Sequence, residues 1–196
     1  MSEEQKKSTN DSLIEETKEI SKFTVLETDS NSARKAKLRI LRINNEKKSI
    51  QNAFKIGTLD KDEIQLLFKL EEWRLGIRGR QGTIWEGGLY CATISFPEDY
   101  PESPPRVRFD NDFEHIYIYS SGDICLDLVN KQGTYKSTVT MINLISELSR
   151  FFFCEEEPNP RCANNLYLYG LWLKDKEAYK ANIKSNADKL KTKILQ

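Results

Sequence analysis

A chain of 196 residues is long enough for one domain with a sizeable core, or for one domain and an extension. Its 30 basic and 30 acidic residues cancel, so the basic excess by which nucleic-acid binders displace counterions is absent. No run approaches the ~20 apolar residues of a membrane span, and the first residues lack the apolar stretch of a secretory signal. We expect a soluble intracellular protein that binds neither nucleic acid nor membranes.

The four cysteines are the first candidates for chemistry. Cys91, Cys125, Cys154 and Cys162 contain no CxxC pair, and His115 is the only histidine in the chain. Zinc sites need clustered Cys and His ligands, so we expect no metal. Disulfides persist mainly in secreted proteins, so we expect free thiols, most of them inert in a core.

The chain opens with a polar segment, residues 1–32, which is rich in Ser, Thr, Glu and Lys and has Phe23 as its only aromatic residue. This composition cannot bury enough apolar surface to offset chain entropy. We therefore predict a disordered N-terminal extension over residues 1–32 and a folded domain over residues 33–196.

An amphipathic helix with a basic outer face is predicted for residues 33–48, with Ser32 as its N-cap. Four strand-like segments follow it, at residues 53–59, 63–77, 87–97 and 106–109. Because the turn-rich connections between the segments are short, we expect an antiparallel meander.

Helical periodicity returns in the last third of the chain. From a start near Thr138, apolar residues recur at helical spacing at Met141, Leu144, Ile145, Leu148, Phe151 and Phe152. Two further helices are expected around residues 163–169 and 174–195. Helix, strands and then helices describe an α+β domain.

A long irregular segment, residues 113–137, contains both His115 and Cys125. Such segments on a rigid scaffold concentrate functional residues. A cysteine and a histidine raise the possibility of a Cys–His hydrolase, but neither an oxyanion donor nor an orienting Asn is evident. An inert, packed Cys125 is the default interpretation of an isolated cysteine.

The neighbourhood of Cys125 matches a known family. FPEDYPESPPRVRF at 96–109, followed by HIYIYSSGDICLDL at 115–128, resembles the ubiquitin-conjugating enzyme signature FPxDYPxxPPxVxF, HPN and GxxCL. GTIWEGGLY at 82–90 and EEEPNP at 155–160 resemble two further family blocks. The resemblance covers about residues 35–195. It implies the ubiquitin-conjugating fold: an N-terminal helix, a four-stranded antiparallel meander, an active-site loop, a central helix and C-terminal helices.

The same resemblance implies a transfer reaction. Cys125 would accept the C-terminal carboxyl of a ubiquitin-like modifier as a thioester from an activating enzyme, and a substrate lysine would then attack it. A thiolate is a strong nucleophile and a good leaving group, so this chemistry needs no metal. ATP would be used by the activating enzyme, and this chain, which has no phosphate-binding GxxxxGK[ST] loop, would hold no cofactor. The implied partners are modifier, activating enzyme, ligase and substrate proteins, in cytoplasm and nucleus.

Some positions depart from the family pattern. His115 matches the first residue of HPN, which implies a structural brace for the loop, whereas Ile116 and Tyr117 replace Pro and Asn. The family's Asn is credited with holding the loop or with stabilising the oxyanion, for which Tyr117 offers a hydroxyl donor of different reach. After EPNP, the Asp-Pro of the family is replaced by Cys162 and Ala163.

Two more residues receive roles from the resemblance. Asp127 matches an acidic residue beside the nucleophile that would orient or deprotonate the incoming lysine, with a solvated loop carboxylate as the alternative. Tyr119 stands where one branch has a tyrosine that lines the lysine channel. The resemblance also implies docking surfaces: Lys37, Arg39 and Arg42 for the activating enzyme, and Pro101, Glu102, Pro104 and Ser137 for a ligase.

The modifier is expected to be of the SUMO type. WRLGIRGRQGTIWEGG has the spacing of the SUMO-conjugating branch, as does the ten-residue step from Cys125 to Tyr135, and Glu102 replaces a Phe frequent in ubiquitin-type enzymes. The N-terminal extension followed by AKLRI resembles the neddylation branch, and Asp127 resembles the ubiquitin branch. Neddylation- and ubiquitin-type enzymes, and a weak or inactive variant that binds a modifier, remain alternatives.

Overall fold

The computed structural model describes residues 31–69, 72–152 and 157–196. Residues 1–30, most of the extension predicted to be disordered, lie outside this description. The chain divides into two compact units, Met1–Leu41 and Arg42–Gln196. The described part of the first unit, residues 31–41, is helical. The prediction of Ser32 as N-cap is wrong because Asn31 and Ser32 are already helical; within a helix each costs less than ~0.7 kcal/mol relative to Ala.

The second unit begins with helical residues 42–55, which bury Ile43, Ile50 and Ala53 on one face. Buried Glu46 lies on this face, and its carboxylate accepts a hydrogen bond from the Met141 amide at 3.0 Å. The strand predicted over 53–59 is therefore wrong. Its first residues complete the helix and the others form a turn, because a short apolar run at a helix end carries no periodicity that separates strand from helix.

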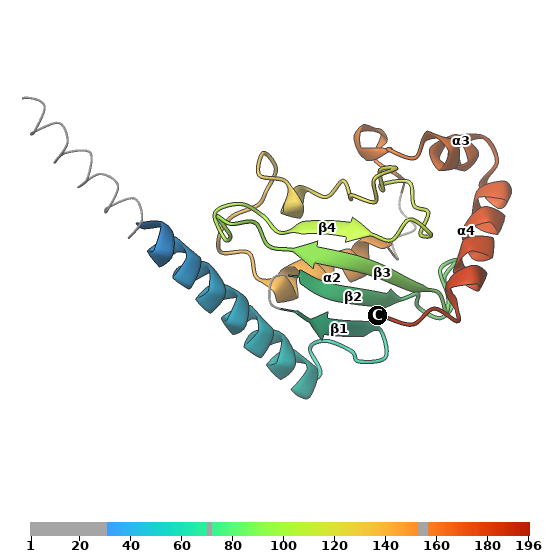
Figure 1. Ribbon diagram of the computed structural model, residues 1–196. Coiled ribbons are helices and arrows are strands. Elements are labelled where there is room, and N and C mark those ends of the chain that lie inside the picture. Colours follow the sequence, from blue (N-terminus) through green and yellow to red (C-terminus); the bar gives the residue numbers. More distant parts are fainter. Residues whose placement is uncertain (1–30, 70–71, 153–156) are drawn as a thin grey trace, which may run out of the picture. The chain divides into compact units, whose positions relative to one another are not determined.

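Four strands form one antiparallel sheet in the order β1-β2-β3-β4, which confirms the predicted meander (Figure 1). They are β1 (Ile64–Phe68), β2 (Glu72–Arg78), β3 (Leu89–Ser95) and β4 (Arg106–Phe109). The single strand expected over 63–77 is in fact the β1–β2 hairpin, with Phe68 opposite Trp73. Both strands contain apolar residues throughout, so the sequence alone did not show where the first ends and the second begins.

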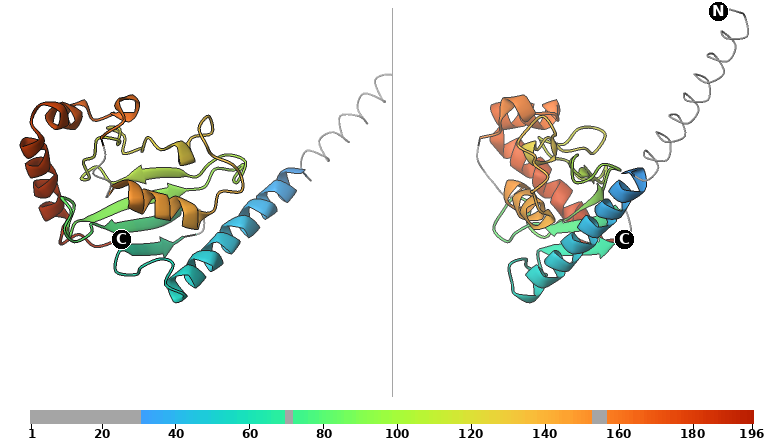
Figure 2. Two further views of the ribbon diagram at one scale, coloured as in Figure 1. Left: turned by 180° about the vertical axis from the view of Figure 1, so that it is seen from behind. Right: turned by 90° about the vertical axis from the view of Figure 1, so that its left-hand side faces the viewer.

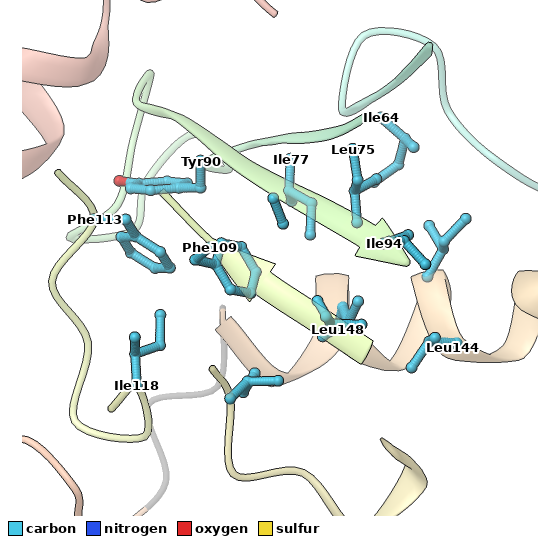
Figure 3. Packing of buried hydrophobic residues seen from close by; sticks show 14 of the residues in the cluster. Ile64, Leu75, Ile77, Tyr90, Ile94, Phe109, Phe113, Ile118, Leu144 and Leu148 are labelled. Atoms are coloured by element: carbon cyan, nitrogen blue, oxygen red, sulfur yellow. The ribbon is translucent and has the colours of Figure 1, made fainter. Parts of the chain in front are cut away.

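The core lies between the sheet and α2 (Met141–Phe152), which crosses one face of the sheet (Figure 2). Leu75, Ile77 and Ile94 of the sheet and Leu144 and Leu148 of α2 are fully or almost fully buried and gather in this layer (Figure 3). The apolar stripe predicted for the central helix is thus confirmed at Met141, Leu144, Ile145 and Leu148. The side chains of Phe151 and Phe152 lie outside the described residues. The helix begins at residue 141 rather than near Thr138.

Two helices, α3 (Leu166–Lys174) and α4 (Lys176–Leu190), follow at one end of the sheet (Figure 1). The ranges predicted for them, 163–169 and 174–195, were wrong. The Asn165 side chain accepts from the Leu168 amide, and the Asp175 side chain accepts from the Ala178 amide, so each residue caps a helix start. The caps set the starts of the two helices, and the apolar pattern of the segment does not indicate these positions.

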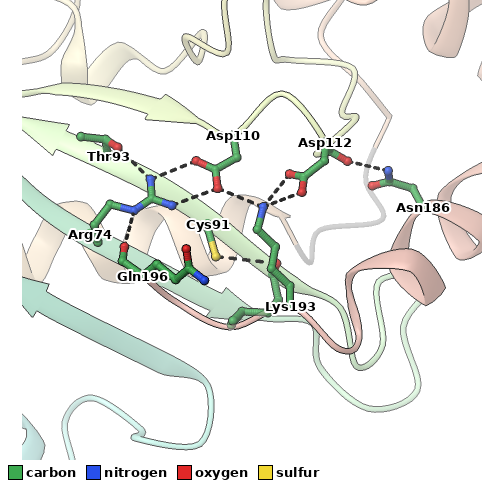
Figure 4. Close-up of polar contacts among 9 residues, drawn as sticks. Arg74, Cys91, Thr93, Asp110, Asp112, Asn186, Lys193 and Gln196 are labelled. Atoms are coloured by element: carbon green, nitrogen blue, oxygen red, sulfur yellow. Dashed lines mark hydrogen bonds and ion pairs between the residues drawn. The ribbon is translucent and has the colours of Figure 1, made fainter.

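Beyond α4 the chain returns to the sheet through polar contacts (Figure 4). The Lys193 ammonium lies 2.9 Å from an Asp110 carboxylate oxygen and 2.6 Å from an Asp112 oxygen. Arg74 of β2 donates two hydrogen bonds to Asp110, each at 2.9 Å. The second unit is therefore an α+β domain whose last residues are fixed to β2 and to the segment after β4. No helix within the described ranges has the length and apolar character to cross a membrane.

Candidate active site

A tight turn shapes the first part of the segment between β4 and α2. The Phe109 amide donates to the Gly122 carbonyl at 2.8 Å, and the Tyr119 amide donates to the Asp123 carbonyl at 2.9 Å. Gly122 has a φ of +84°, and a Cβ there would lie 2.3 Å from the Phe109 carbonyl oxygen. Only glycine fits this position, and the turn brings the following residues back beside the loop.

Cys125 comes directly after this turn, and its amide donates to the Tyr117 carbonyl at 2.9 Å. Its side chain is half-buried and lines a pocket of about 320 Å³. Tyr117, Asp127, Asn159 and Cys162 also line this pocket. The structure thus brings the predicted nucleophile together with two of its predicted helpers, Tyr117 and Asp127, and with two residues that had no predicted role, Asn159 and Cys162.

His115 braces the loop from within. It is buried, with its ring centroid 5.2 Å from that of Trp85, and its Nδ1 accepts a hydrogen bond from the Tyr117 amide at 3.1 Å. Burial lowers the pKa of the imidazole to about 3. Such a ring cannot hold a thiol proton at neutral pH, and it does not line the pocket of Cys125. The geometry therefore gives no support to a Cys–His hydrolase.

The residues that replace the family's Pro and Asn connect the loop to the C-terminal elements. The Ile116 carbonyl accepts hydrogen bonds from the Asn164 and Asn165 amides, at 2.9 and 3.0 Å. The Tyr117 hydroxyl oxygen accepts from the Asn159 amide at 2.8 Å. The loop that carries Cys125 is thus held against residues 159–165.

Tyr119 does not line the pocket of Cys125 and is 46% exposed. The sulfur of Cys125 beside it raises the pKa of the Tyr119 hydroxyl, through its charge and through a hydrogen bond between the two groups. Burial adds to this effect, whereas a hydrogen bond with Asn164 lowers the pKa. The phenol therefore stands next to the nucleophile as a neutral group at physiological pH.

Cys162 ends a short 3-10 helix, η2 (Pro160–Cys162), and is half-buried. Burial, followed by a hydrogen bond with the Cys125 thiol and the charges of Cys125 and Asp127, raises the pKa of Cys162 to about 11. The sequence assigned no role to this residue. Its position after EPNP, where the family carries an acidic residue, was the one sequence feature that could have indicated a place near the nucleophile.

Asp127 is exposed and begins a 3-10 helix, η1 (Asp127–Val129), directly after the nucleophile. Within the described ranges, no group of three or more Cys, His, Asp or Glu side chains could hold a metal ion. The pocket of Cys125 offers two half-buried thiols, the Tyr117 phenol and the carboxylates of Asp127 and Glu147.

The residues predicted to dock the activating enzyme belong to both compact units. Lys37 and Arg39 belong to the helical part of the first unit. In the second unit, Arg42 donates to a Glu46 carboxylate oxygen at 2.8 Å and to the Val139 carbonyl at 2.9 Å, so its guanidinium already holds elements of this domain together.

The predicted ligase-docking loops meet within the second unit. The Pro101 carbonyl accepts from the Tyr135 hydroxyl at 2.6 Å, which joins the loop after β3 to the segment before α2. In these two segments Glu102 is exposed, and Pro104 and Ser137 are half-buried.

A half-buried thiol on a braced loop of an α+β domain is an arrangement that suits thiol-dependent group transfer. The sequence profile of the ubiquitin-conjugating enzyme family matches residues 42–187. The chain therefore belongs to the ubiquitin-conjugating enzyme family. It is a conjugating transferase that works through a thioester intermediate, with a modifier, an activating enzyme, ligases and substrates as partners.

Three relatives are similar to this chain over more than half of its length. The chain is 35% identical to the Sumo-conjugating enzyme ubc9 of Dictyostelium discoideum, over 59% of this chain and 70% of the relative. It is 32% identical to the SUMO-conjugating enzyme SCE1 of Arabidopsis thaliana, over 57% and 68%. Identity to the SUMO-conjugating enzyme UBC9 of Caenorhabditis elegans is 28%, over 65% and 75%.

Proposed function

We propose that this chain is a SUMO-conjugating enzyme and that Cys125 carries the modifier. The observation that carries this proposal is the position of Cys125, half-buried in a pocket at the end of a braced loop. The names of the three relatives support SUMO as the modifier. The SUMO-type spacing from Trp73 to Gly88 supports it independently.

In the first step, the Cys125 thiolate attacks the thioester that links the modifier to the activating enzyme. The modifier's carboxyl carbon passes to Cys125, and the activating enzyme's thiolate leaves. In the second step a substrate lysine amine attacks the new thioester, and the Cys125 thiolate leaves as the amide forms. Because a thiolate is a good leaving group, neither step needs a metal or a cofactor in this chain. ATP is consumed by the activating enzyme.

Three residues assist the second step in this proposal. The Tyr117 hydroxyl, at the wall of the pocket, donates to the oxyanion that develops on the carboxyl carbon. Tyr119, beside the Cys125 sulfur, lines the approach of the lysine. Asp127, exposed next to the nucleophile, orients the lysine amine. The proposal thus assigns the residues nearest the thiol to the aminolysis step.

The docking roles complete the proposal. Lys37, Arg39 and Arg42 face an acidic surface of the activating enzyme, and the loops that contain Pro101, Glu102, Pro104 and Ser137 face a ligase. We place the enzyme in the cytoplasm and nucleus, with its catalytic domain beginning near residue 33.

A panel of charging reactions tests this function. The protein is incubated with ATP and with SUMO, ubiquitin or the neddylation modifier, each with its own activating enzyme, and separated on non-reducing gels. We expect a reducible adduct with SUMO, lost in Cys125→Ala. An adduct with another modifier alone would overturn the SUMO assignment, and no adduct with any modifier would favour a modifier-binding module.

A further inference from the structure

Two thiols share the pocket of the nucleophile. Cys125 and Cys162 are both half-buried and both line the same cavity of about 320 Å³. The Cys125 sulfur also contributes to the raised pKa of the Cys162 thiol, as expected for two side chains at the same wall of the cavity. The transfer reaction described above uses only one of them.

A short chain of hydrogen bonds fixes the two cysteines relative to each other. The Cys125 amide donates to the Tyr117 carbonyl at 2.9 Å, and the Tyr117 hydroxyl accepts from the Asn159 amide at 2.8 Å. The Cys162 amide in turn donates to the Asn159 carbonyl at 3.0 Å. Tyr117 and Asn159 therefore hold both cysteine backbones at one wall of the pocket.

From this geometry we propose that Cys125 and Cys162 form a reversible intramolecular disulfide when the enzyme is exposed to a peroxide. Cys125 follows an irregular loop and Cys162 ends a helix of only three residues. Neither residue lies in a paired strand or an α-helix, so side-chain rotation within the hydrogen-bonded frame is expected to bring the two sulfurs to bonding distance.

The two thiols have different parts in this reaction. Peroxides oxidise the thiolate form, and the raised pKa of Cys162 keeps its thiol protonated near neutral pH. We assign Cys125, the nucleophile of the proposed transfer reaction, as the sulfur that reacts with the peroxide, and Cys162 as the thiol that resolves the product. Cys91 is excluded because it is fully buried within β3 and burial raises its pKa.

The atoms balance over two steps. The Cys125 thiol and one hydrogen peroxide give the sulfenic acid and one water. The Cys162 sulfur then attacks the sulfenic sulfur, its proton joins the departing hydroxyl as a second water, and the S–S bond forms. Each cysteine sulfur is oxidised by one electron, and the peroxide accepts both electrons. A dithiol reductant reverses the change by thiol–disulfide exchange.

The disulfide has two consequences for the transfer reaction, and both rest on the proposed function. While the bond exists, Cys125 cannot accept the modifier. The bond also protects Cys125 from further oxidation to the sulfinic acid, which is irreversible for nearly all proteins. Formation of the disulfide itself does not depend on the identity of the modifier.

The sequence permits a direct test, because trypsin places each cysteine in a different peptide: residues 81–106, 109–131, 151–161 and 162–174. The full-length protein is treated with hydrogen peroxide, its remaining thiols are blocked, and the digest is analysed by mass spectrometry. We expect peptide 109–131 linked to peptide 162–174, with the link lost after dithiothreitol. A link from 109–131 to 151–161 instead, or no link to 109–131 in the wild-type digest, would overturn the proposal.

Two variants sharpen the test. In Cys162→Ser the link is absent and Cys125 accumulates as sulfinic acid faster than in the wild type, whereas Cys154→Ser keeps the link. Equal rates of sulfinic acid formation in Cys162→Ser and wild type would contradict the protective role. Modifier charging is measured before peroxide is added and after dithiothreitol. Loss of charging before oxidation argues against the proposed function, while the peptide map still decides the disulfide.

Discussion

The hydroxyl oxygen of Tyr117 accepts a hydrogen bond from the Asn159 amide at 2.8 Å. Tyr117 stands at the position that the family fills with Asn, and its backbone carbonyl also accepts from the Cys125 amide. One residue therefore connects the nucleophile to the EPNP segment through both its backbone and its side chain. The Tyr117 side chain is longer than that of Asn, and its hydroxyl reaches the Asn159 amide to hold the loop.

Removing this hydroxyl tests its part in transfer. We expect Tyr117→Phe to form the thioester at nearly the wild-type rate but to pass the modifier to free lysine at least about tenfold more slowly, because an oxyanion donor is worth a few kcal/mol. The folding free energy falls by about 1 kcal/mol through loss of the hydrogen bond with Asn159. Single-turnover lysine discharge measures the effect. Tyr167→Phe, on exposed α3, is the matched control, and equal discharge in the two variants would refute the role of Tyr117.

Cys162 offers the opposite experiment, a gain of function. Replacing Cys162 by Asp restores an acidic side chain at the position where the family has one, within the pocket of Cys125. We expect lysine discharge to accelerate several-fold, most clearly below the pKa of the lysine, because the carboxylate favours approach of the amine. Cys162→Ser separates this charge effect from simple loss of the thiol. A rate for Cys162→Asp no higher than that of Cys162→Ser contradicts the expectation.

His115 predicts a pH dependence of stability. Burial lowers its pKa to about 3 in the folded protein, whereas an unfolded histidine titrates near 6.5. The unfolded state therefore binds more protons, so this stabilising contribution is complete above about pH 6.5 and is lost as the pH falls toward 3. Between pH 6.5 and 5 the loss is roughly 2 kcal/mol.

Chemical denaturation at several pH values checks this dependence. His115 is the only histidine in the chain, and the carboxylates titrate mostly below pH 5, so little else contributes in this interval. The stability of His115→Gln, although lower, is expected to be nearly flat between pH 6.5 and 5. A variant that loses stability with the same slope as the wild type would show that His115 is not buried as a neutral ring.

The three basic docking residues are expected to respond differently. Reversing Lys37 and Arg39 to Glu slows charging by the activating enzyme, most strongly at low salt where exposed charges are least screened. Arg42→Glu slows charging and also destabilises the domain, because its guanidinium binds Glu46 and the Val139 carbonyl. Charging rates and thermal unfolding are measured for each. Normal charging of the Lys37 and Arg39 variant at low salt would show that these residues do not dock the activating enzyme.

Much of this architecture is readable in the sequence because apolar periodicity and family motifs report burial directly. The meander, the central helix and the loop that contains Cys125 follow from such patterns. The pairing of Phe68 with Trp73 and the turn at residues 56–59 do not, because a few charged residues or one glycine in an apolar run do not by themselves mark the end of an element. The helix caps at Asn165 and Asp175 depend on single side-chain contacts.

In the site, too, some features can be predicted from motifs and others depend on tertiary contacts. Cys125, His115 and Tyr117 were found because they occupy positions of a motif. The proximity of Cys162 to Cys125 could not be read from their separation in the chain, because it depends on how residues 159–165 return to the loop through Ile116 and Tyr117. Likewise, the inward contacts of Arg42 arise from the packing of its helix against the start of α2, which a pattern of basic residues does not record.

The most direct test of the central claim is the intact mass of the protein after a single charging reaction with SUMO, its activating enzyme and ATP. The account predicts that the wild type gains the mass of one SUMO minus one water and loses it with dithiothreitol. Cys125→Ser is predicted to form an adduct of the same type that survives the reductant, because an oxygen ester does not undergo thiol exchange. A SUMO adduct that remains reducible in Cys125→Ser would contradict the account and place the transfer on another cysteine.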